Sequence, residues 1–480
     1  MENQPMSPAF PHSRSVPFAV AALLALIALA LPAAAPAAPK GTNAKALKHG
    51  TLVQLKGLRG CIADRSAKTK GCGTARALKG PGPFMGSRAI GVSPDGKNVY
   101  VASSRSDAIA IFRRDTSTGA LTQPKGAAGC VANESTGGCA KAVGLDAPNS
   151  IAISPDGKNV YATSRNSNAL TVFQRGKGGQ LTQLPVGFGC ISGLPVPVCA
   201  SGRALVGPDV LVISPDGKNV YVGSFFGNAI AVFNRDPASG ALAQAAGTTG
   251  CLAEAISGCA PALALGAPEG LAISAAGTSL YAATALSNAV VVLSRDPSTG
   301  ALTQATTGSG CIANATLAGC ATGVQLSGAN AVAVSPGGSD VYVTSLLSNS
   351  VTSFTRAVPA GTLTQKEATA ACLIYLRSAG CSFGRALIGP EGLAVSPDGT
   401  NVYVASFRSG AIAVLDRSRE TGVVTQKPGA AGCLTAPKTP GCAPGRALRG
   451  VSSIALSPDG RYVYSTSFGS NAVNIFRRNK

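Results

Sequence analysis

The segment Ile151-Ala-Ile-Ser-Pro-Asp-Gly-Lys-Asn-Val-Tyr-Ala-Thr-Ser164 decides the fold of this protein. An apolar run precedes a Pro-Asp-Gly turn signal and a second apolar run follows it, a pattern typical of two antiparallel strands joined by a tight turn. The Ser-Pro-Asp-Gly string recurs, in places degenerate, at steps of 60 or 61 residues. Its seven copies begin at Ser93, Ser154, Ser214, Ser274, Ser335, Ser396 and Ser457.

Each copy continues with two further strands. In the second copy these are Ala169–Phe173 and Leu181–Gln183, with no helical period of apolar residues between them. A lone four-stranded antiparallel sheet cannot bury both faces, whereas seven such sheets packed radially around an axis can. The sequence therefore predicts an all-β, seven-bladed β-propeller with four-stranded antiparallel blades over residues 50–480.

The two ends of the chain predict how the ring closes. The last copy ends at its third strand, Asn474–Lys480, and lacks an outer strand. A matching Leu-Val-Gln stands at 52–54, nine residues before Cys61, which is also the offset of Leu121 from Cys130. We therefore expect the N-terminal strand to complete the last blade and to remove an open sheet edge.

Three side chains recur at one place in every copy: tyrosine in the second strand, glutamine in the outer strand and arginine at the end of the third. A residue needed in every blade is best explained by packing, hydrogen bonding and turn charge. An alternative for the arginines is a basic ring on one face. The tyrosines are Tyr100, Tyr161, Tyr221, Tyr281, Tyr342, Tyr403 and Tyr464, and the arginines Arg114, Arg175, Arg235, Arg295, Arg356, Arg417 and Arg478.

The 14 cysteines form one pair per copy, between the outer strand of one blade and the inner strand of the next. An even number of cysteines at regular spacing in an exported chain indicates disulfides. Zinc is the rival, but the pairs are separate and only His49 would remain in the mature chain. The expected pairs are Cys61/Cys72, Cys130/Cys139, Cys190/Cys199, Cys251/Cys259, Cys311/Cys320, Cys372/Cys381 and Cys433/Cys442.

The N-terminal residues have the pattern of an export signal. Arg14 precedes an apolar run over 18–31, and small residues with an Ala-Pro-Ala site at 35–37 follow. We interpret 1–37 as a signal peptide and 38–49 as a linker, which predicts a secreted or extracytoplasmic protein at the cell surface or in the periplasm. The alternative is an uncleaved anchor. The run is too short to span a bilayer comfortably, and no later stretch reaches that length.

Composition limits the class of protein. Hydrophobic residues make up 45% of the 480, and the 59 glycines show no period of three, which excludes a disordered or collagen-like chain. The formal charge of +20 favours anionic partners or serves solubility alone. Export makes nucleic acid an unsuitable partner, and we expect a monomer.

The blades Asn401–Ser406, Asn228–Phe233 and Arg295–Gln304 resemble the seven-bladed propeller family that includes 6-phosphogluconolactonase-like lactonases and surface proteins with Tyr-Val-Thr-Asn repeats. The resemblance extends over about residues 50–480. It implies either hydrolysis of a sugar lactone or an extracytoplasmic binding role. No catalytic motif of the lactonases matches particular positions of this chain, and the cysteine loops lengthen its repeat.

The copies differ at two sets of positions, which are the candidate site. Five residues before each Ser-Pro-Asp-Gly serine, a polar ring is expected at the mouth of the channel. The catalytic candidates are its carboxylates, which could act as Ca²⁺ ligands or as a general base: Asp209, Glu269 and Glu391. The ligand-binding candidates of the ring are Arg88, Asn149 and Asn330. Alternatively these side chains cap backbone groups or bind water. The ring comprises Arg88, Asn149, Asp209, Glu269, Asn330, Glu391 and Ser452.

The second set is two residues wide and follows each second strand. Blades three to five have apolar residues at these positions, and blades one and two have basic ones. If exposed, these residues suit a protein or glycan partner. The alternative is that the cysteine loops fold over the apolar residues and bury them. The ligand-binding candidates are Arg105, Arg165, Phe225, Phe226, Phe407 and Arg408. The pairs are Ser104/Arg105, Arg165/Asn166, Phe225/Phe226, Ala285/Leu286, Leu346/Leu347, Phe407/Arg408 and Phe468/Gly469.

The sequence favours a noncatalytic recognition or surface-interaction module that uses the disulfide-loop face, with a protein, a glycan or an anionic cell-surface polymer as partner. It contains no Gly-x-Ser-x-Gly nucleophile motif. The alternative is a lactonase-like hydrolase that acts on a small sugar lactone at the channel mouth. No cofactor is expected, apart from Ca²⁺ or another divalent cation under that alternative.

Overall fold

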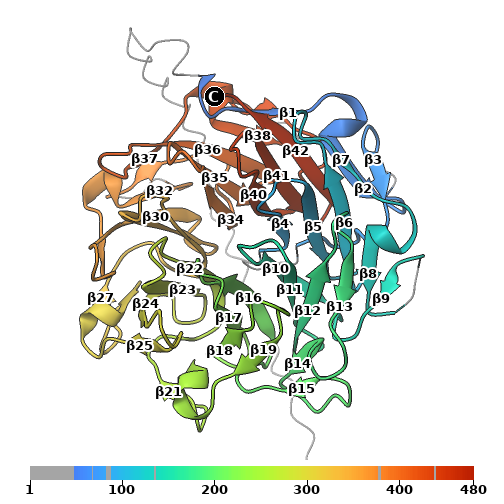
Figure 1. Cartoon of the computed structure of the whole chain (residues 1–480). Helices are drawn as coiled ribbons and strands as arrows, with labels where there is room; N and C mark the ends of the chain where they lie inside the picture. Colours follow the sequence, from blue (N-terminus) through green and yellow to red (C-terminus); the bar gives the residue numbers. More distant parts are fainter. Residues whose placement is uncertain (1–47, 68, 83–87, 135–136, 377–379, 437–438) are drawn as a thin grey trace, which may run out of the picture. The chain divides into compact units, whose positions relative to one another are not determined.

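The computed structural model describes residues 48–67, 69–82, 88–134, 137–376, 380–436 and 439–480. The predicted signal peptide 1–37, and the linker 38–49 apart from its last two residues, lie outside the described residues. The segment Thr42–Lys480 is one compact unit. Within it, seven sheets follow one another around a channel, and the inner strand of the first blade lies beside that of the last (Figure 1). The predicted seven-bladed β-propeller is confirmed.

Three strands of each blade follow the prediction closely. The inner strands are β4 (Ile90–Val92), β10 (Pro148–Ile153), β16 (Pro208–Ile213), β22 (Pro268–Ile273), β28 (Ala329–Val334), β34 (Pro390–Val395) and β40 (Val451–Leu456). The second strands are β5 (Asn98–Ser103), β11 (Asn159–Ser164), β17 (Asn219–Ser224), β23 (Ser279–Thr284), β29 (Asp340–Ser345), β35 (Asn401–Ser406) and β41 (Tyr462–Ser467). The third strands are β6 (Ala108–Arg114), β12 (Ala169–Arg175), β18 (Ala229–Arg235), β24 (Ala289–Arg295), β30 (Ser350–Arg356), β36 (Ala411–Arg417) and β42 (Ala472–Arg478).

The outer edge of each blade is built from three short strands, so the sheets have six strands where four were expected. The Leu-Thr-Gln type strands are β1 (Leu52–Gln54), β7 (Leu121–Thr122), β13 (Leu181–Gln183), β19 (Leu242–Gln244), β25 (Leu302–Gln304), β31 (Leu363–Gln365) and β37 (Val424–Gln426). The strands that begin at a cysteine are β2 (Cys61–Asp64), β8 (Cys130–Ala132), β14 (Cys190–Ser192), β20 (Cys251–Ala253), β26 (Cys311–Ala313), β32 (Cys372–Ile374) and β38 (Cys433–Thr435). The edge strands are β3 (Gly73–Ala75), β9 (Ala140–Lys141), β15 (Ala200–Ser201), β21 (Ala260–Pro261), β27 (Ala321–Thr322), β33 (Ser382–Phe383) and β39 (Ala443–Pro444).

The extra strands arise because a three-residue outer strand covers only half of a seven-residue third strand. In the second blade, β13 pairs with the last three residues of β12 and β14 with its first three. The edge strand β15 then adds in parallel to β14. In six blades a short 3-10 helix lies between the two outer segments: η1 (Gly57–Gly60), η2 (Gly126–Gly129), η3 (Gly247–Gly250), η4 (Gly308–Gly310), η5 (Ala368–Ala370) and η6 (Gly429–Gly432).

The seven predicted disulfides are all present, with Cα–Cα distances of 4.8 or 4.9 Å. Each joins the start of a cysteine strand to the residue just before an edge strand, so it closes a loop at the rim of a blade. The pairing is the one expected from the sequence: Cys61 with Cys72, Cys130 with Cys139, Cys190 with Cys199, Cys251 with Cys259, Cys311 with Cys320, Cys372 with Cys381, and Cys433 with Cys442.

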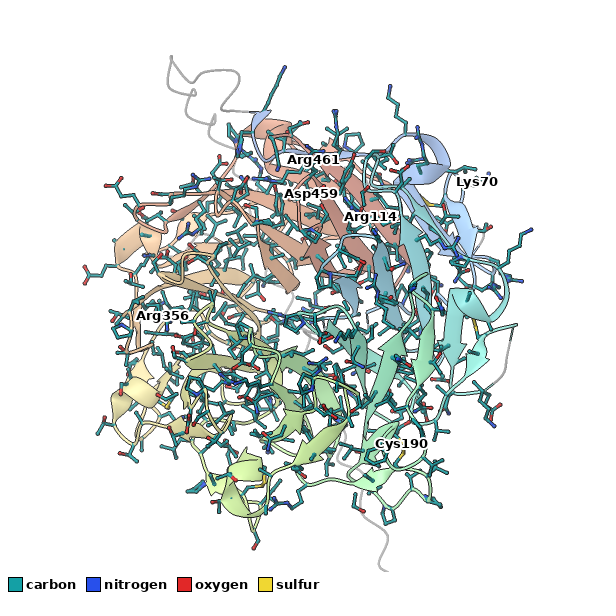
Figure 2. The ribbon with its side chains drawn as sticks, in the orientation of Figure 1. Lys70, Arg114, Cys190, Arg356, Asp459 and Arg461 are labelled. Carbon is teal, nitrogen blue, oxygen red and sulfur yellow. A yellow bond between two sulfur atoms is a disulfide. The ribbon has the colours of Figure 1, made fainter. Side chains whose placement is uncertain are left out.

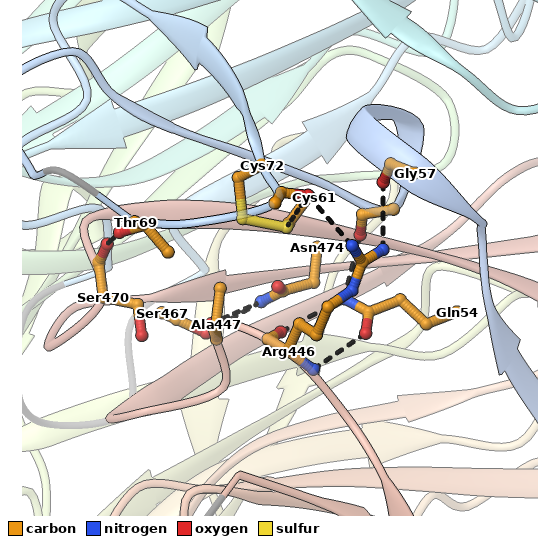
Figure 3. The surroundings of a disulfide bond; sticks show 12 residues. Gln54, Gly57, Cys61, Thr69, Cys72, Arg446, Ala447, Ser467, Ser470 and Asn474 are labelled. Atoms are coloured by element: carbon orange, nitrogen blue, oxygen red, sulfur yellow. Dashed lines mark hydrogen bonds between the residues drawn. A yellow bond between two sulfur atoms is a disulfide. The ribbon is translucent and has the colours of Figure 1, made fainter.

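In three blades, within the described residues, an arginine of the preceding blade donates a hydrogen bond to the backbone of the cysteine loop. Arg446, for example, donates hydrogen bonds to the carbonyl oxygens of Gly57 and Gly71 beside Cys61–Cys72 (Figure 3). The disulfide and the arginine therefore hold the same loop, one from within its blade and the other from the neighbouring blade.

The ring closes as expected from the chain ends. Strand β1 pairs antiparallel with β42, with Leu52 opposite Arg478. The cysteine strand β2 pairs with the other half of β42, with Cys61 opposite Asn474. The N-terminal segment thus supplies three of the six strands of the last blade.

The recurring tyrosines and arginines join each blade to the next. The Tyr161 hydroxyl donates to the carbonyl oxygen of Gly240 (2.8 Å), and Arg235 Nε donates to the Tyr161 hydroxyl oxygen (2.8 Å). The same two bonds recur at all seven boundaries. In the first blade Arg114 also lies near Asp459 of the last blade, at 3.7 Å (Figure 2). Six of the arginines are only 2–7% exposed, so they do not form a basic ring on a face.

The recurring glutamines make a second set of contacts between blades. The Gln183 side-chain amide accepts a hydrogen bond from the Val143 backbone N–H and donates one to its carbonyl oxygen, both at 2.8 Å. Equivalent pairs occur in every blade. A structural role for these repeated residues therefore follows from their contacts. No helix in the described ranges is long and apolar enough to cross a membrane.

Candidate functional site

The polar ring occupies a specific backbone feature of the inner strands. In blades two to seven the inner strand pairs with the second strand through a register shift, and the skipped residue is the ring residue. Asn149, for example, lies between Pro148, opposite Ser164, and Ser150, opposite Thr163. Such β-bulges redirect a side chain, often next to a functional site. The bulges therefore bring polar side chains from neighbouring blades together near the channel.

Asp209 is the centre of one cluster in this ring. Its Oδ1 accepts hydrogen bonds from Asn149 Nδ2 and from Arg165 Nη2, each at 2.5 Å. Asp209 is fully buried, and its Oδ2 has no hydrogen-bond partner among the residues that the structure describes. Burial raises the pKa of Asp209, although the charge of Arg165 and the Asn149 hydrogen bond oppose the rise. The structure thus joins two ring residues to a residue of the second variable set.

Glu269, on the next blade, is 1% exposed. Burial raises its pKa well above the usual value, the charges of Asp209 and Glu391 add to the rise, and Arg165 opposes it. A glutamate in such a place keeps its proton at a pH at which an exposed glutamate is ionised. Its carboxyl group therefore suits the role of a proton donor better than that of a metal ligand.

The remaining ring members lie in different surroundings. Asn330 Nδ2 donates to the carbonyl oxygen of Pro390 (3.0 Å), and Ser452 Oγ to that of Gly82 (3.1 Å). Glu391 is fully buried in the wall of the channel. Among the described residues no three acidic, histidine or cysteine side chains are grouped to hold a metal ion, so the predicted Ca²⁺ site has no cluster there.

The channel itself is a cavity of about 490 Å³. Its walls are mainly aliphatic side chains of the inner strands, such as Ile153, Ile213 and Val334. Arg88 extends across it, from the first blade to the carbonyl oxygen of Val332 in the fifth, where Nη2 donates a 3.2 Å hydrogen bond. The Arg88 side chain is exposed and is part of the lining of this cavity.

The disulfides stand apart from the channel. The described lining of the channel contains no cysteine. The second cysteine of each disulfide, such as Cys199, Cys381 or Cys442, therefore does not contribute to the polar ring. These three cysteines are bonded to Cys190, Cys372 and Cys433 and precede the edge strands β15, β33 and β39. The disulfide cysteines predicted from the sequence are therefore parts of the scaffold at the blade rims and not groups of the candidate site.

Aromatic and basic side chains of the second variable set lie above the ring. Arg165 stacks over the Phe225 ring at 5.0 Å, and Arg105 over the Phe468 ring at 4.2 Å. Phe407 and Phe468 are 6.3 Å apart. Phe225 and Phe407 are partly buried, whereas Arg105 and Arg408 are exposed. The arginines of blades one and two therefore pack on aromatic rings, and only part of their charge faces solvent.

The second residue of each apolar pair in blades three to five is exposed, whereas Phe225 is partly buried and Leu346 is buried. The exposed fractions are 62% for Phe226, 67% for Leu286 and 60% for Leu347. Leu286 borders a groove of about 550 Å³, which Leu263 and Leu317 also line. Leu263 and Leu317 belong to cysteine-loop regions, and they were not identified from the sequence as site residues. The cysteine loops, unlike the strands, have no period that separates exposed from buried residues, so no signal marked them.

The comparisons with known proteins agree with this fold. The family described as "Lactonase, 7-bladed beta-propeller" matches residues 203–309 and 264–438. A solved 6-phosphogluconolactonase candidate from Bacteroides uniformis is 19% identical, with 82% of this chain and 91% of that chain covered and a TM-score of 0.51. The hydrazine synthase of Kuenenia stuttgartiensis is 20% identical, with 83% of this chain and 97% of that chain covered and a TM-score of 0.50. No curated protein matches this chain.

These identities are low, so the solved structures bear on the fold alone. The fold defines a disulfide-bonded seven-bladed β-propeller. The match to the lactonase family model over residues 203–438 agrees with this architecture and with the resemblance that the repeated blade sequences indicated.

Proposed function

We propose that this protein is an extracytoplasmic recognition module that binds a protein partner through the groove of blades three and four and the adjacent apolar side chains. The observation that carries the proposal is the exposure of Phe226, Leu286 and Leu347 on three consecutive blades. Isolated exposed apolar side chains are common, but exposed apolar side chains at the equivalent place on consecutive blades, one of them beside a groove, are typical of an interaction site. We call the set Phe226, Leu263, Leu286, Leu317 and Leu347 the apolar patch.

The disulfides favour binding by this face. Glu254 lies between Cys251 and Cys259, Leu317 lies between Cys311 and Cys320, and both residues line the groove. A closed loop loses less conformational entropy when it binds, so the walls of the groove are preorganised. Seven disulfides are also typical of an oxidising compartment, which supports a partner met outside the cytoplasm.

Charge indicates which kind of protein partner fits. The formal net charge is +20, and a basic protein attracts acidic partners over long range and raises the rate of encounter. Apolar side chains would supply the buried contact and acidic ones the attraction. We therefore propose a partner segment with apolar residues flanked by aspartate or glutamate.

The proposal predicts the outcome of a peptide selection. Peptides selected from a random display library on the oxidised protein should be apolar with acidic flanks. Their affinity should fall by about 10- to 100-fold in a Leu286→Asp variant, because truncation of a central apolar contact typically costs about 2 kcal/mol or more. Binding would be measured by biolayer interferometry.

Val186 provides the matched control, because it is 73% exposed but lies on another blade, before Cys190. A Val186→Asp variant should bind the same peptides as the wild type does. Equal binding to the Leu286→Asp and Leu347→Asp variants would show that the apolar patch is not the site. Leu286 and Leu347 are both exposed, so these variants should fold normally.

Lactone hydrolysis is a second candidate function, favoured by the family match and by the position of Glu391 in the channel wall. Under this hypothesis Glu391 acts as the general base, and Glu269, beside Asp209, as a proton donor. The channel volume of about 490 Å³ lies within the range of about 300–1,000 Å³ typical of small-molecule sites. The burial of all three carboxyl groups counts against ready access by a substrate.

A panel of sugar and aliphatic lactones tests this candidate. If it is correct, the wild type hydrolyses at least one lactone, and Glu391→Gln lowers kcat/KM about 100-fold or more, as loss of a general base does. Glu420→Gln is the control, because Glu420 is exposed and remote from the channel wall. No turnover of any lactone, or equal turnover by the Glu391→Gln variant, would exclude Glu391 as the base.

A further inference from the structure

Arg88 is placed in an unusual way for a charged side chain. It is exposed and lines the channel cavity, and its hydrogen bond goes to a backbone carbonyl oxygen, that of Val332. Among the described residues no carboxylate forms an ion pair with it. A guanidinium has five N–H donors, so most of its hydrogen-bonding capacity faces the space inside the channel.

The walls around Arg88 are apolar. Side chains such as Ile90, Ile151, Leu211 and Leu393 line the cavity together with glycine and alanine. Glu391 also lines the cavity, but that residue is 0% exposed, so its carboxylate is not accessible to solvent there. The exposed charge inside the channel is therefore positive, and low-dielectric walls strengthen the attraction of an anion to it.

We propose that the channel binds a small aliphatic carboxylate, with its carboxylate on Arg88 and its hydrocarbon part between the inner strands. The planar fork of a guanidinium matches a carboxylate through two parallel hydrogen bonds. The aliphatic walls remove the hydrocarbon part from water. This site differs from the apolar patch, which lies on the outer surface, and its ligand is not hydrolysed.

The proposal also accounts for the position of Arg88 in the ring. In blades two to seven the equivalent residues are buried, with exposed fractions of 0–2%. Asn149, Asn330 and Ser452 are occupied with neighbouring protein groups. Among the described ring members, Arg88 is the one whose side chain is exposed. One blade of seven thus carries a feature that the scaffold does not need.

Isothermal titration of the oxidised protein with octanoate tests the site. The wild type should bind octanoate, and Arg88→Met should weaken binding at least tenfold, because hydrogen bonds to a charged group are stronger than those between neutral groups. Arg88→Lys should retain part of the affinity, since the charge remains while the fork is lost. 1-Octanol, which has the same chain without the charge, should bind at least tenfold more weakly than octanoate.

Arg113→Met is the matched control, because Arg113 is an exposed arginine of the same blade, on β6. It should bind octanoate as the wild type does. Near-ultraviolet circular dichroism would show that each variant is folded. Absence of octanoate binding by the wild type at millimolar concentration, equal affinity of Arg88→Met, or equal affinity for 1-octanol would each overturn the proposal. A Leu286→Asp variant should leave octanoate binding unchanged, which separates this site from the apolar patch.

Discussion

A chain that begins at Lys56 is expected to lose about 3 kcal/mol or more of unfolding free energy relative to a chain that begins at Lys48. The shorter chain lacks β1, whose Leu52 is 6% exposed and packs with Tyr403 and Phe476. Loss of a buried leucine side chain typically costs about 2–5 kcal/mol. Removal of Gly50 also leaves the buried Tyr403 hydroxyl without its acceptor, a further cost of about 1–3 kcal/mol.

The same truncation exposes half of the edge of β42. Unpaired backbone groups on a sheet edge template association with other chains, so the shorter protein should also form oligomers. Guanidinium denaturation and size-exclusion chromatography with light scattering would measure the two effects. Both chains retain all 14 cysteines, so disulfide content does not differ. Equal stability and a monomeric state for both chains would show that the N-terminal strand is not needed for closure.

Arg478→Met is expected to reduce the unfolding free energy by about 3–5 kcal/mol, the usual cost of breaking a buried ion pair by removal of one partner. Arg478 is 2% exposed. It donates to the Tyr403 hydroxyl (2.8 Å), to Asn401 Oδ1 (2.7 Å) and to Thr400 Oγ1 (2.8 Å), and it pairs with Asp398 at 2.8 Å. These contacts join the sixth and seventh blades, where the ring closes.

The adjacent Arg477 supplies a control in the same strand, because it is exposed. Arg477→Met should change stability by no more than about 0.5 kcal/mol, as surface substitutions usually do. Methionine preserves most of the alkyl stem in both variants, so the comparison isolates the buried hydrogen bonds. A similar loss in the two variants would contradict the role assigned to Arg478.

The Arg478 effect should depend on pH. Burial alone raises the pKa of Asp398, but hydrogen bonds from Arg478, Ser396 and Thr400 outweigh it and hold the pKa well below its usual range. An aspartate with a depressed pKa stabilises the folded state at pH values above its unfolded pKa of about 3.9, and this stabilisation is lost as pH falls. The difference between wild type and Arg478→Met should therefore shrink as the pH is lowered from about 6 to about 3.

The strand order of the blades could be predicted because repetition reveals it. Seven copies of one pattern fix the inner, second and third strands, and the missing outer strand of the last copy shows that Leu52–Gln54 closes the ring. The two extra outer strands could not be predicted in the same way. Cys190–Ser192 and Ala200–Ser201 are too short to show a period. Cys190–Ser192 becomes a strand because the free half of the β12 edge is available to it, and Ala200–Ser201 then pairs with Cys190–Ser192.

The candidate site, like the strands, could be predicted from the sequence only in part. Sequence comparison between copies identified the variable positions, including Asp209, Glu269 and Arg88, since a side chain that differs between equivalent blades is not required by the scaffold. It did not show that a β-bulge directs these side chains or that Arg165 pairs with Asp209. Contacts between residues of neighbouring blades depend on the radial packing of the sheets.

The sequence by itself therefore determined the number of blades, the closure of the ring and the pairing of the cysteines, because these depend on local pattern and on a period of 60 or 61 residues. The tertiary structure decided which polar and apolar groups are exposed. It buries Glu269 and leaves Leu286 in solvent, and it presents Arg88 to the channel. Exposure depends on what the next blade places against a residue, and no local stretch of sequence contains that information.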